Sequence, residues 1–189
     1  MIWSTLLFGG TAAIFLGMTA SALFHLRWTR RLPSLSELTP APQPIKSVLC
    51  SVVLAARDEE SRIETTLRRL LAQEGVRLEL IVVDDRSQDG TSEILRRLAK
   101  EHGCVTVKRI DLLPEGWLGK CHACHVGASA ATGDWILFTD ADCWMKPDAI
   151  ARALRVAERE RADHITLTPG VAPESSGDSP VRGVRARSD

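Results

Sequence analysis

The sequence predicts an α/β protein with an open, mostly parallel sheet and flanking helices, preceded by one N-terminal transmembrane helix. Three observations lead to this prediction. Strand-like and helix-like patterns alternate between residues 47 and 167, the strand-like runs are almost wholly apolar, and a charge-free run of 25 residues, Ile2 to Leu26, opens the chain. Alternation of this kind is typical of parallel sheets. Strands that helices cover on both faces have no polar side, which explains the apolar runs.

The charge-free run is predicted to be a membrane anchor over residues 1–28. As a helix it would be about 37 Å long, enough to cross a hydrocarbon core of about 30 Å. Trp3 and Trp28 lie near its ends, where indole rings favour the membrane interface. Three arginines follow within residues 27–31. The positive-inside rule then places a single-pass protein in the inner cell membrane, with the rest of the chain in the cytoplasm.

Two other interpretations of this run stay open. Ala20, Ser21 and Ala22 form a small-residue pattern typical of signal-peptide cleavage. Against it, no basic residue precedes the run, and the run is longer than a signal-peptide core. A buried helix of a soluble domain is the third interpretation, which a stretch without charge on any side disfavours.

Two segments without regular structure are predicted to flank one folded domain over residues 47–169. Residues 29–46 are expected to be a semi-rigid linker, because they contain four prolines that interrupt any regular helix. Residues 170–189 are expected to be a disordered tail. They contain no aromatic residue and only five apolar ones, and Ser, Gly, Pro and Arg dominate.

The domain itself is predicted element by element from its hydrophobic pattern. Short apolar runs predict strands at 48–55, 78–83, 105–110, 134–138 and 164–167. Apolar residues at helical spacing predict helices at 59–73 and 91–102. A run of small residues predicts a helix at 120–131, and Pro147 is placed for the first turn of a helix at 147–161.

The charge and cysteine composition narrows the class of protein. With 24 basic and 24 acidic side chains the formal net charge is zero, which does not fit a nucleic-acid partner, because phosphate neutralisation needs a clustered basic excess. The five cysteines are an odd number in a chain long enough to form a core without disulfides. We expect them to be mostly reduced, as in the cytosol.

Acidic residues follow two of the predicted strands. Asp84 and Asp85 end the second apolar run, and Asp140 and Asp142 follow the fourth. Because parallel strands present ligands at their carboxyl ends, we expect these side chains to share one cleft. Alternate residues of an extended segment point to one side, so Asp140 and Asp142 can approach the same ion. Mg²⁺ or Mn²⁺ typically takes one or two carboxylates and completes its shell with water and substrate phosphates.

Helix capping is the structural alternative for acidic residues in this region. Asp89 precedes Thr91 at a predicted helix start, so either role is open for it. No helix is expected to begin directly after Asp142, and two neighbouring carboxylates repel unless a cation joins them. Metal binding is therefore the stronger interpretation for Asp140 and Asp142.

Three segments, 53–60, 84–91 and 139–142, together resemble the family 2 glycosyltransferases of the GT-A (Rossmann-like) fold, and the last contains their aspartate-x-aspartate signature. The resemblance covers residues 47–167 and implies a nucleotide-sugar-binding domain. It implies transfer of a sugar from a nucleotide-diphosphate donor, with UDP-sugar as the expected donor, in a metal-assisted, inverting reaction.

The resemblance also implies roles for particular residues. Six would bind the nucleotide: Ala56, Arg57, Glu59, Asp84, Asp85 and Asp140. Among them, Asp85 with Asp84 beside it would hold the uracil and ribose. Asp140 and Asp142 would hold the metal, Mg²⁺ or Mn²⁺.

Lys120 is a further candidate that the residues themselves suggest. It follows Gly119 at an expected helix start, where free N–H groups and the helix dipole favour phosphate. Its ammonium group can neutralise a diphosphate leaving group, although a solvated surface lysine is the alternative. The surrounding residues, 113–120 with 128–134, look most like the hopanoid-biosynthesis-associated branch of the family. With the predicted anchor, this favours a lipid acceptor of polyprenyl or hopanoid type.

Residues 121–125 read Cys-His-Ala-Cys-His, which matches the c-type haem attachment pattern. Combined with the signal-peptide interpretation, this pattern gives a periplasmic haem protein as a remote alternative. A cytoplasmic orientation would prevent the attachment, and the acidic clusters would have no role. A closed zinc site needs four ligands at workable spacing, and this segment equally fits a packed helix.

The catalytic assignments are Asp142 and Lys120, with the general base expected to be absent from this chain. Inversion needs a carboxylate base beside the acceptor, which in this family follows well after the metal motif. Few ordered residues are expected after Asp142. We therefore expect a C-terminally truncated chain that binds donor and transfers little. The alternative is a non-catalytic nucleotide-sugar-binding fragment.

Overall fold

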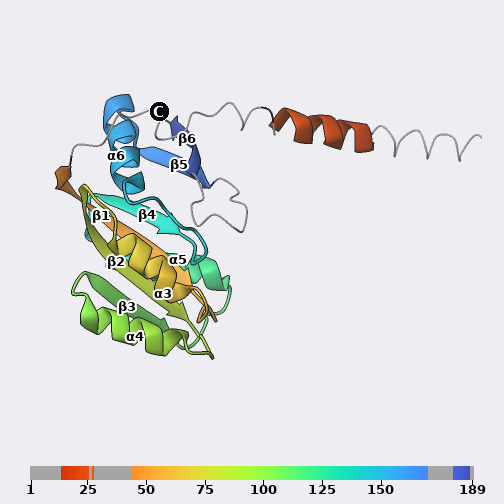
Figure 1. Cartoon of the computed structure of the whole chain (residues 1–189). Coiled ribbons are helices and arrows are strands. Elements are labelled where there is room, and N and C mark those ends of the chain that lie inside the picture. The colour runs from red at the N-terminus through yellow and green to blue at the C-terminus, as the bar shows by residue number, and fades with distance from the viewer. Residues whose placement is uncertain (1–13, 26, 28–43, 170–180, 188–189) are drawn as a thin grey trace, which may run out of the picture.

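Four parallel strands form the main sheet of the protein, in the order β3-β2-β1-β4 (Figure 1). The computed structural model describes residues 14–25, 27, 44–169 and 181–187. The strands are β1 (Ile45–Ala56), β2 (Val76–Asp85), β3 (Val105–Ile110) and β4 (Trp135–Thr139). The helices that connect and cover them are α3 (Ile63–Leu71), α4 (Thr91–Glu101), α5 (Gly119–Ala130) and α6 (Ala149–Glu160). The predicted parallel sheet with flanking helices is confirmed.

Helices cover both faces of this sheet, which explains the apolar runs in its central strands. Side chains such as Val52 and Leu54 of β1 pack in one core with α3 and α4. Val83 of β2 packs on the opposite face, in a smaller cluster with Ala123 of α5. Successive residues of a strand point to opposite faces, so both alternating sets must be hydrophobic here.

The register of the strands brings the acidic segments to one edge of the sheet. Ala56 at the end of β1 lies opposite Asp84 of β2, and Leu54 lies opposite Thr139 at the end of β4. The loops after β1, β2 and β4 therefore meet at the carboxyl edge. This is the edge at which open α/β sheets bind ligands.

The fifth predicted strand is present but does not join the main sheet. β5 (His164–Pro169) pairs antiparallel with β6 (Val181–Arg187) in a separate two-stranded sheet. β6 lies within residues 170–189, for which the sequence predicted a disordered tail, and the structure gives Val181–Arg187 as a strand paired with β5. The composition of residues 170–189 does not indicate a strand, because the backbone hydrogen bonds of β6 come from its pairing with β5.

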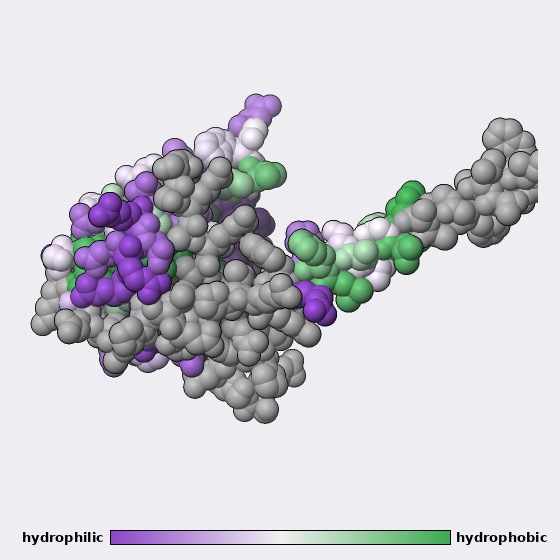
Figure 2. Space-filling view, turned by 90° about the horizontal axis from the view of Figure 1, so that it is seen from above, coloured by the Kyte–Doolittle hydropathy of each residue, from purple (hydrophilic) through white to green (hydrophobic). Residues whose placement is uncertain are grey.

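The described N-terminal residues form a helix over 14–25 whose apolar side chains are exposed. Phe15 and Leu16, for example, are 71% and 74% exposed. Figure 2 shows these apolar (green) side chains along the helix. Within the described residues, no helix has both the length and the apolar character needed to cross a membrane. The predicted membrane-spanning helix is thus not supported there, and much of the anchor and linker lies outside the described residues, at 1–13, 26 and 28–43.

Candidate active site

The loop after β1 and the loop after β2 are tied to each other by hydrogen bonds. The Asp58 carboxylate accepts the backbone N–H of Gln88 at 2.7 Å, and the Asp58 N–H donates to Ser87 Oγ at 3.1 Å. Asp58 and Arg86 have positive φ angles of 54° and 59°, a conformation that costs free energy in residues other than glycine. The reciprocal bonds between the loops offset that cost and fix the walls of the cleft.

Asp89 has a structural role, as a turn former before the start of α4, which is the alternative that the sequence left open for it. One of its carboxylate oxygens accepts the N–H of Thr91 at the start of α4, and the other accepts the N–H of Glu60, both at 3.0 Å. The Thr91 hydroxyl in turn accepts the N–H of Glu59 at 2.8 Å. These bonds shorten the predicted helix at 59–73, because the chain up to residue 62 forms the cleft loop and α3 begins at Ile63.

Asp84, unlike the other predicted nucleotide-binding residues, does not line the cleft. Its side chain is buried and bonds to the Ser87 N–H at 3.2 Å, the Ser92 hydroxyl at 2.5 Å and the Arg109 guanidinium at 2.6 Å. Burial acts to raise the pKa of the Asp84 carboxyl, but the hydrogen bonds from Ser87, Ser92 and Arg109 outweigh it and hold the pKa below its ordinary value. Asp84 therefore supports the loop structurally.

This depressed pKa makes Asp84 a source of acid-dependent stability. A carboxyl whose pKa is lower in the folded than in the unfolded state stabilises the protein. This contribution is complete at pH values above the unfolded-state pKa, about 3.9, and is lost as the pH falls through the folded-state pKa. Asp84→Asn should lower the free energy of unfolding by about 1–3 kcal/mol at pH 7, because Arg109 loses its buried partner. The difference from wild type should shrink below about pH 4, as urea unfolding at several pH values would show.

Asp111 provides a matched control for this prediction, because it contacts the same guanidinium at 3.2 Å but is 82% exposed. Asp111→Asn should leave the unfolding free energy nearly unchanged at either pH. A destabilisation by Asp84→Asn that is equally large at pH 7 and in acid would contradict the ionic role of Asp84.

Asp85 points to the other side of β2 and does line the cleft, where Arg86 holds it. The Arg86 guanidinium donates to both Asp85 oxygens, at 2.7 and 3.1 Å. Gly119 packs directly on this pair, since a Cβ there would lie 2.7 Å from Asp85 Oδ2 and 2.9 Å from Arg86 Nη2. Each carboxylate oxygen has a second lone pair, so Asp85 keeps acceptor capacity for a ligand.

The loop after β4, which carries Asp140 and Asp142, is anchored to α3. The buried Thr66 hydroxyl donates to the Ala141 carbonyl, and it accepts the indole N–H of Trp144 at 3.2 Å. The Trp144 ring also lies 4.7 Å from the Arg69 guanidinium carbon. Trp144 is therefore a loop anchor, and Thr66 is a positioning residue that the sequence analysis did not identify.

Asp140, Asp142 and Cys143 each place one ligand atom within 4.8 Å of the other two. This is the one such group of three or more acidic, cysteine or histidine side chains among the described residues. Two carboxylates in a partly exposed loop that leaves room for water and phosphate are the donor set that Mg²⁺ and Mn²⁺ prefer. The predicted pair Asp140 and Asp142 thus fits a divalent cation, and Cys143 adds a thiol that the sequence analysis did not include.

Lys120 reaches from the start of α5 to this acidic group. Its Nζ lies 2.6 Å from Asp140 Oδ1, and the two side chains are 66% and 51% exposed. The hydrogen bond to Asp140 raises the pKa of Lys120 above its usual value, with a smaller contribution from the charge of Asp142. Lys120 is therefore a cation in the cleft at neutral pH, and not an isolated surface lysine.

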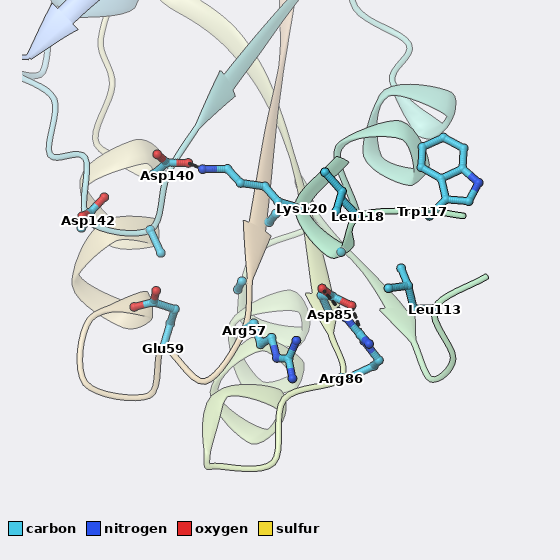
Figure 3. Close-up of a pocket in the computed structure, with 14 residues that line it drawn as sticks. Arg57, Glu59, Asp85, Arg86, Leu113, Trp117, Leu118, Lys120, Asp140 and Asp142 are labelled. Atoms are coloured by element: carbon cyan, nitrogen blue, oxygen red, sulfur yellow. Dashed lines mark hydrogen bonds and ion pairs between the residues drawn. The ribbon is translucent and has the colours of Figure 1, made fainter. Parts of the chain in front are cut away.

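These side chains surround one pocket of about 580 Å³, a size typical of small-molecule sites (Figure 3). Seven of the eight predicted site residues line it: Ala56, Arg57, Glu59, Asp85, Lys120, Asp140 and Asp142. The remaining lining residues were not predicted as site residues: Ala55, Arg86, Leu113, Trp117, Leu118, Gly119 and Ala141. Figure 3 shows Asp140 and Asp142 on one side of the pocket and the Asp85–Arg86 pair on the other, with Lys120 between them.

Trp117 connects the pocket to the Cys-His-Ala-Cys-His segment, which lies inside α5. The indole ring stacks on His125, with centroids 5.1 Å apart, and meets His122 edge-on at 5.2 Å. All five cysteines fall within the described residues and are free thiols. The histidines of the segment thus support an aromatic side chain at the pocket rim.

An open α/β sheet with a charged pocket at its carboxyl edge is an arrangement that nucleotide-binding domains share. The family model described as glycosyl transferase family 2 matches residues 51–183. The chain belongs to this family. The match includes every pocket-lining residue and the Cys-His-Ala-Cys-His segment.

Among relatives, the chain is similar to two 4,4'-diaponeurosporenoate glycosyltransferases. It is 41% identical to that of Staphylococcus haemolyticus over 92 residues, covering 49% of this chain and 24% of the relative. It is 35% identical to that of Staphylococcus aureus (strain USA300) over 101 residues, covering 53% and 26%. The matched part thus spans about a quarter of the length of these curated relatives.

Solved structures with a similar fold agree with a GT-A-like domain. The mannosyltransferase PcManGT from Pyrobaculum calidifontis, in complex with GDP-Man and Mn²⁺, has a TM-score of 0.60 and 25% identity. That alignment covers 86% of this chain and 45% of PcManGT. TarS of S. aureus, in complex with UDP, has a TM-score of 0.56 and 24% identity over 68% of this chain and 37% of TarS.

Proposed function

We propose that the chain binds a nucleoside diphosphate sugar, with UDP as the nucleotide, together with a divalent cation, and donates the sugar to an apolar acceptor. One observation carries the proposal. Side chains from the loops after β1, β2 and β4 and from the start of α5 line a single pocket, and they combine carboxylates for a metal with cations for phosphate. Membership of a sugar-transferring family supports the same reaction.

The chain's own residues divide the donor between them. Lys120 lies in the first turn of α5, and with Arg57 across the pocket it presents positive charge to a diphosphate. Asp85, oriented by Arg86, accepts hydrogen bonds from the nucleoside. A metal held by Asp140 and Asp142 would act as a Lewis acid on the leaving diphosphate, and we propose Mn²⁺ because the PcManGT complex contains it. Inversion at the anomeric carbon belongs to the same proposal.

Exposed apolar side chains at the pocket rim support an apolar acceptor. Leu118 and Trp117, which line the pocket, are 75% and 41% exposed. Exposed apolar groups of this size gather where a protein meets an apolar partner. The relatives are named for diaponeurosporenoate, a carotenoid acid, and we propose a lipid-like acceptor for this chain as well.

Three finer assignments remain predictions from the sequence: the hopanoid branch, the anchor in the inner membrane and the cytoplasmic orientation. The run of 25 residues without charge, followed by arginines, supports the anchor. The haem alternative has less support, because the family match includes the Cys-His-Ala-Cys-His segment and both of its histidine rings contact Trp117.

Titration calorimetry of the full chain with UDP tests the proposal. UDP should bind in the presence of Mn²⁺ and bind at least about tenfold more weakly with EDTA, because the cation bridges carboxylates and phosphates. GDP should bind more weakly than UDP, because the proposal assigns uracil as the nucleotide base. If no nucleoside diphosphate binds with Mn²⁺ or Mg²⁺ present, the proposal is wrong. Binding without sugar transfer would favour the non-catalytic interpretation.

A further inference from the structure

The ion pair between Lys120 and Asp140 uses a carboxylate that the proposed metal would also use. Lys120 Nζ lies 2.6 Å from Asp140 Oδ1. The ligand atoms of Asp140 and Asp142 lie within 4.8 Å of each other, close enough for two like charges to repel. In the absence of a metal, the Lys120 ammonium is the positive charge that the acidic pair needs.

We propose that Lys120 takes the place of the divalent cation on Asp140, and that metal binding displaces it toward the diphosphate. The inference rests on the proposed function and deepens it, since it couples the two ligands of the same pocket. An ammonium group and a divalent ion repel each other strongly at such short range, so Lys120 on Asp140 opposes a metal on the same carboxylate. Binding of one therefore weakens the hold of the other.

Several features make Lys120 the group that moves. Its side chain is 66% exposed and has a flexible four-carbon stem, whereas Asp140 follows β4 directly in a loop anchored by Thr66. Lys120 also lies in the first turn of α5, where free backbone N–H groups already favour a phosphate. A short rotation of the stem therefore carries the ammonium from a carboxylate to a second anionic partner.

Lys120 should therefore have opposite effects on metal binding and on nucleotide binding. Lys120 competes with the metal when no nucleotide is present, so it weakens metal binding to the empty pocket. Once a metal has released it, Lys120 strengthens nucleotide binding. The metal and the nucleotide should therefore bind cooperatively, and by linkage each raises the affinity for the other by the same factor.

The test measures Mn²⁺ affinity without nucleotide, by electron paramagnetic resonance of free Mn²⁺, for wild type and Lys120→Met. Methionine keeps an unbranched stem but removes the charge. Mn²⁺ should bind the variant about two- to fivefold more tightly, the range expected when an exposed ion pair no longer competes. UDP affinity at saturating Mn²⁺, measured by calorimetry, should fall by about tenfold, since a charge-assisted contact to phosphate is lost.

Lys100→Met is the matched control, because Lys100 is exposed on α4 and does not line the pocket. It should change neither affinity, and circular dichroism melts would show that each variant is folded. Unchanged or weaker Mn²⁺ binding in Lys120→Met, with wild type binding both ligands, overturns this inference alone. A wild-type chain that binds neither Mn²⁺ nor UDP overturns the proposed function itself.

Discussion

Asp142→Asn is expected to abolish most of the Mn²⁺-dependent gain in UDP binding. An amide keeps the size of the side chain but loses the negative charge, and hard divalent cations select carboxylate oxygens. Losing even a group that supports a metal ligand costs about 10- to 100-fold in metal affinity, so a direct ligand should cost at least that much. UDP affinity in EDTA should stay at the wild-type value, because the substitution affects only the metal-dependent part of UDP binding.

The comparison needs two further variants. Asp163→Asn alters an exposed aspartate between α6 and β5, outside the pocket, and should leave the Mn²⁺ effect intact. Asp140→Asn should also lower Mn²⁺ binding, but it frees Lys120 from its 2.6 Å contact at the same time. If UDP binding to Asp142→Asn keeps its full dependence on Mn²⁺, then Asp142 is not a metal ligand.

The parallel sheet and the meeting of the two acidic segments could be predicted because both follow from general properties of such sheets. Fully apolar strands require cover on both faces, and parallel strands end at a common edge. The register that places Ala56 opposite Asp84 and Leu54 opposite Thr139 then brings Asp85 and Asp140 to one pocket. A continuous apolar run that ends at acidic residues is enough to place a strand end.

Asp84 and Asp85 have separate roles, and the hydrophobic pattern of the sequence did not predict which of them faces the cleft. Adjacent residues of a strand point to opposite faces, so one signal was present: both aspartates could not line the same cleft. Which of them faces the cleft depends on the packing of α4 and α5, and Arg109, from β3, holds Asp84 away from it. Arg86, which pairs with Asp85, has a positive φ that its residue type does not predict.

Contacts between distant segments account for the other differences. Thr66 lies 75 residues before Ala141, and nothing in its own segment indicates that it anchors the metal loop. The sequence of β6 alone does not predict a strand, because β5 supplies the groups to which its backbone hydrogen-bonds. Composition and periodicity describe one segment at a time, and these features belong to pairs of segments.

Gly127→Ala is expected to destabilise the domain by about 1–3 kcal/mol, the usual cost of forcing an extra group into a packed core. Gly127 lies within α5, where its missing side chain lets the helix lie close to the sheet. A Cβ there would lie 2.3 Å from Cγ1 of Val53 and 3.3 Å from Cγ2 of Val83, both fully buried. Alanine gains up to about 1 kcal/mol of helix propensity, but branched valines have little rotamer freedom with which to move away.

The same substitution should weaken UDP binding, because α5 carries Gly119 and Lys120 into the pocket. Gly103→Ala is the control, since no heavy atom lies within 4 Å of its added Cβ, and urea unfolding should show little change. Adding Val53→Ala to Gly127→Ala removes the clashing methyl group and should restore part of the lost stability, although Val53→Ala alone opens a cavity. If Gly127→Ala leaves the unfolding free energy unchanged, or Val53→Ala gives no rescue, then α5 does not approach the sheet this closely, and the position of Lys120 in the pocket would need another cause.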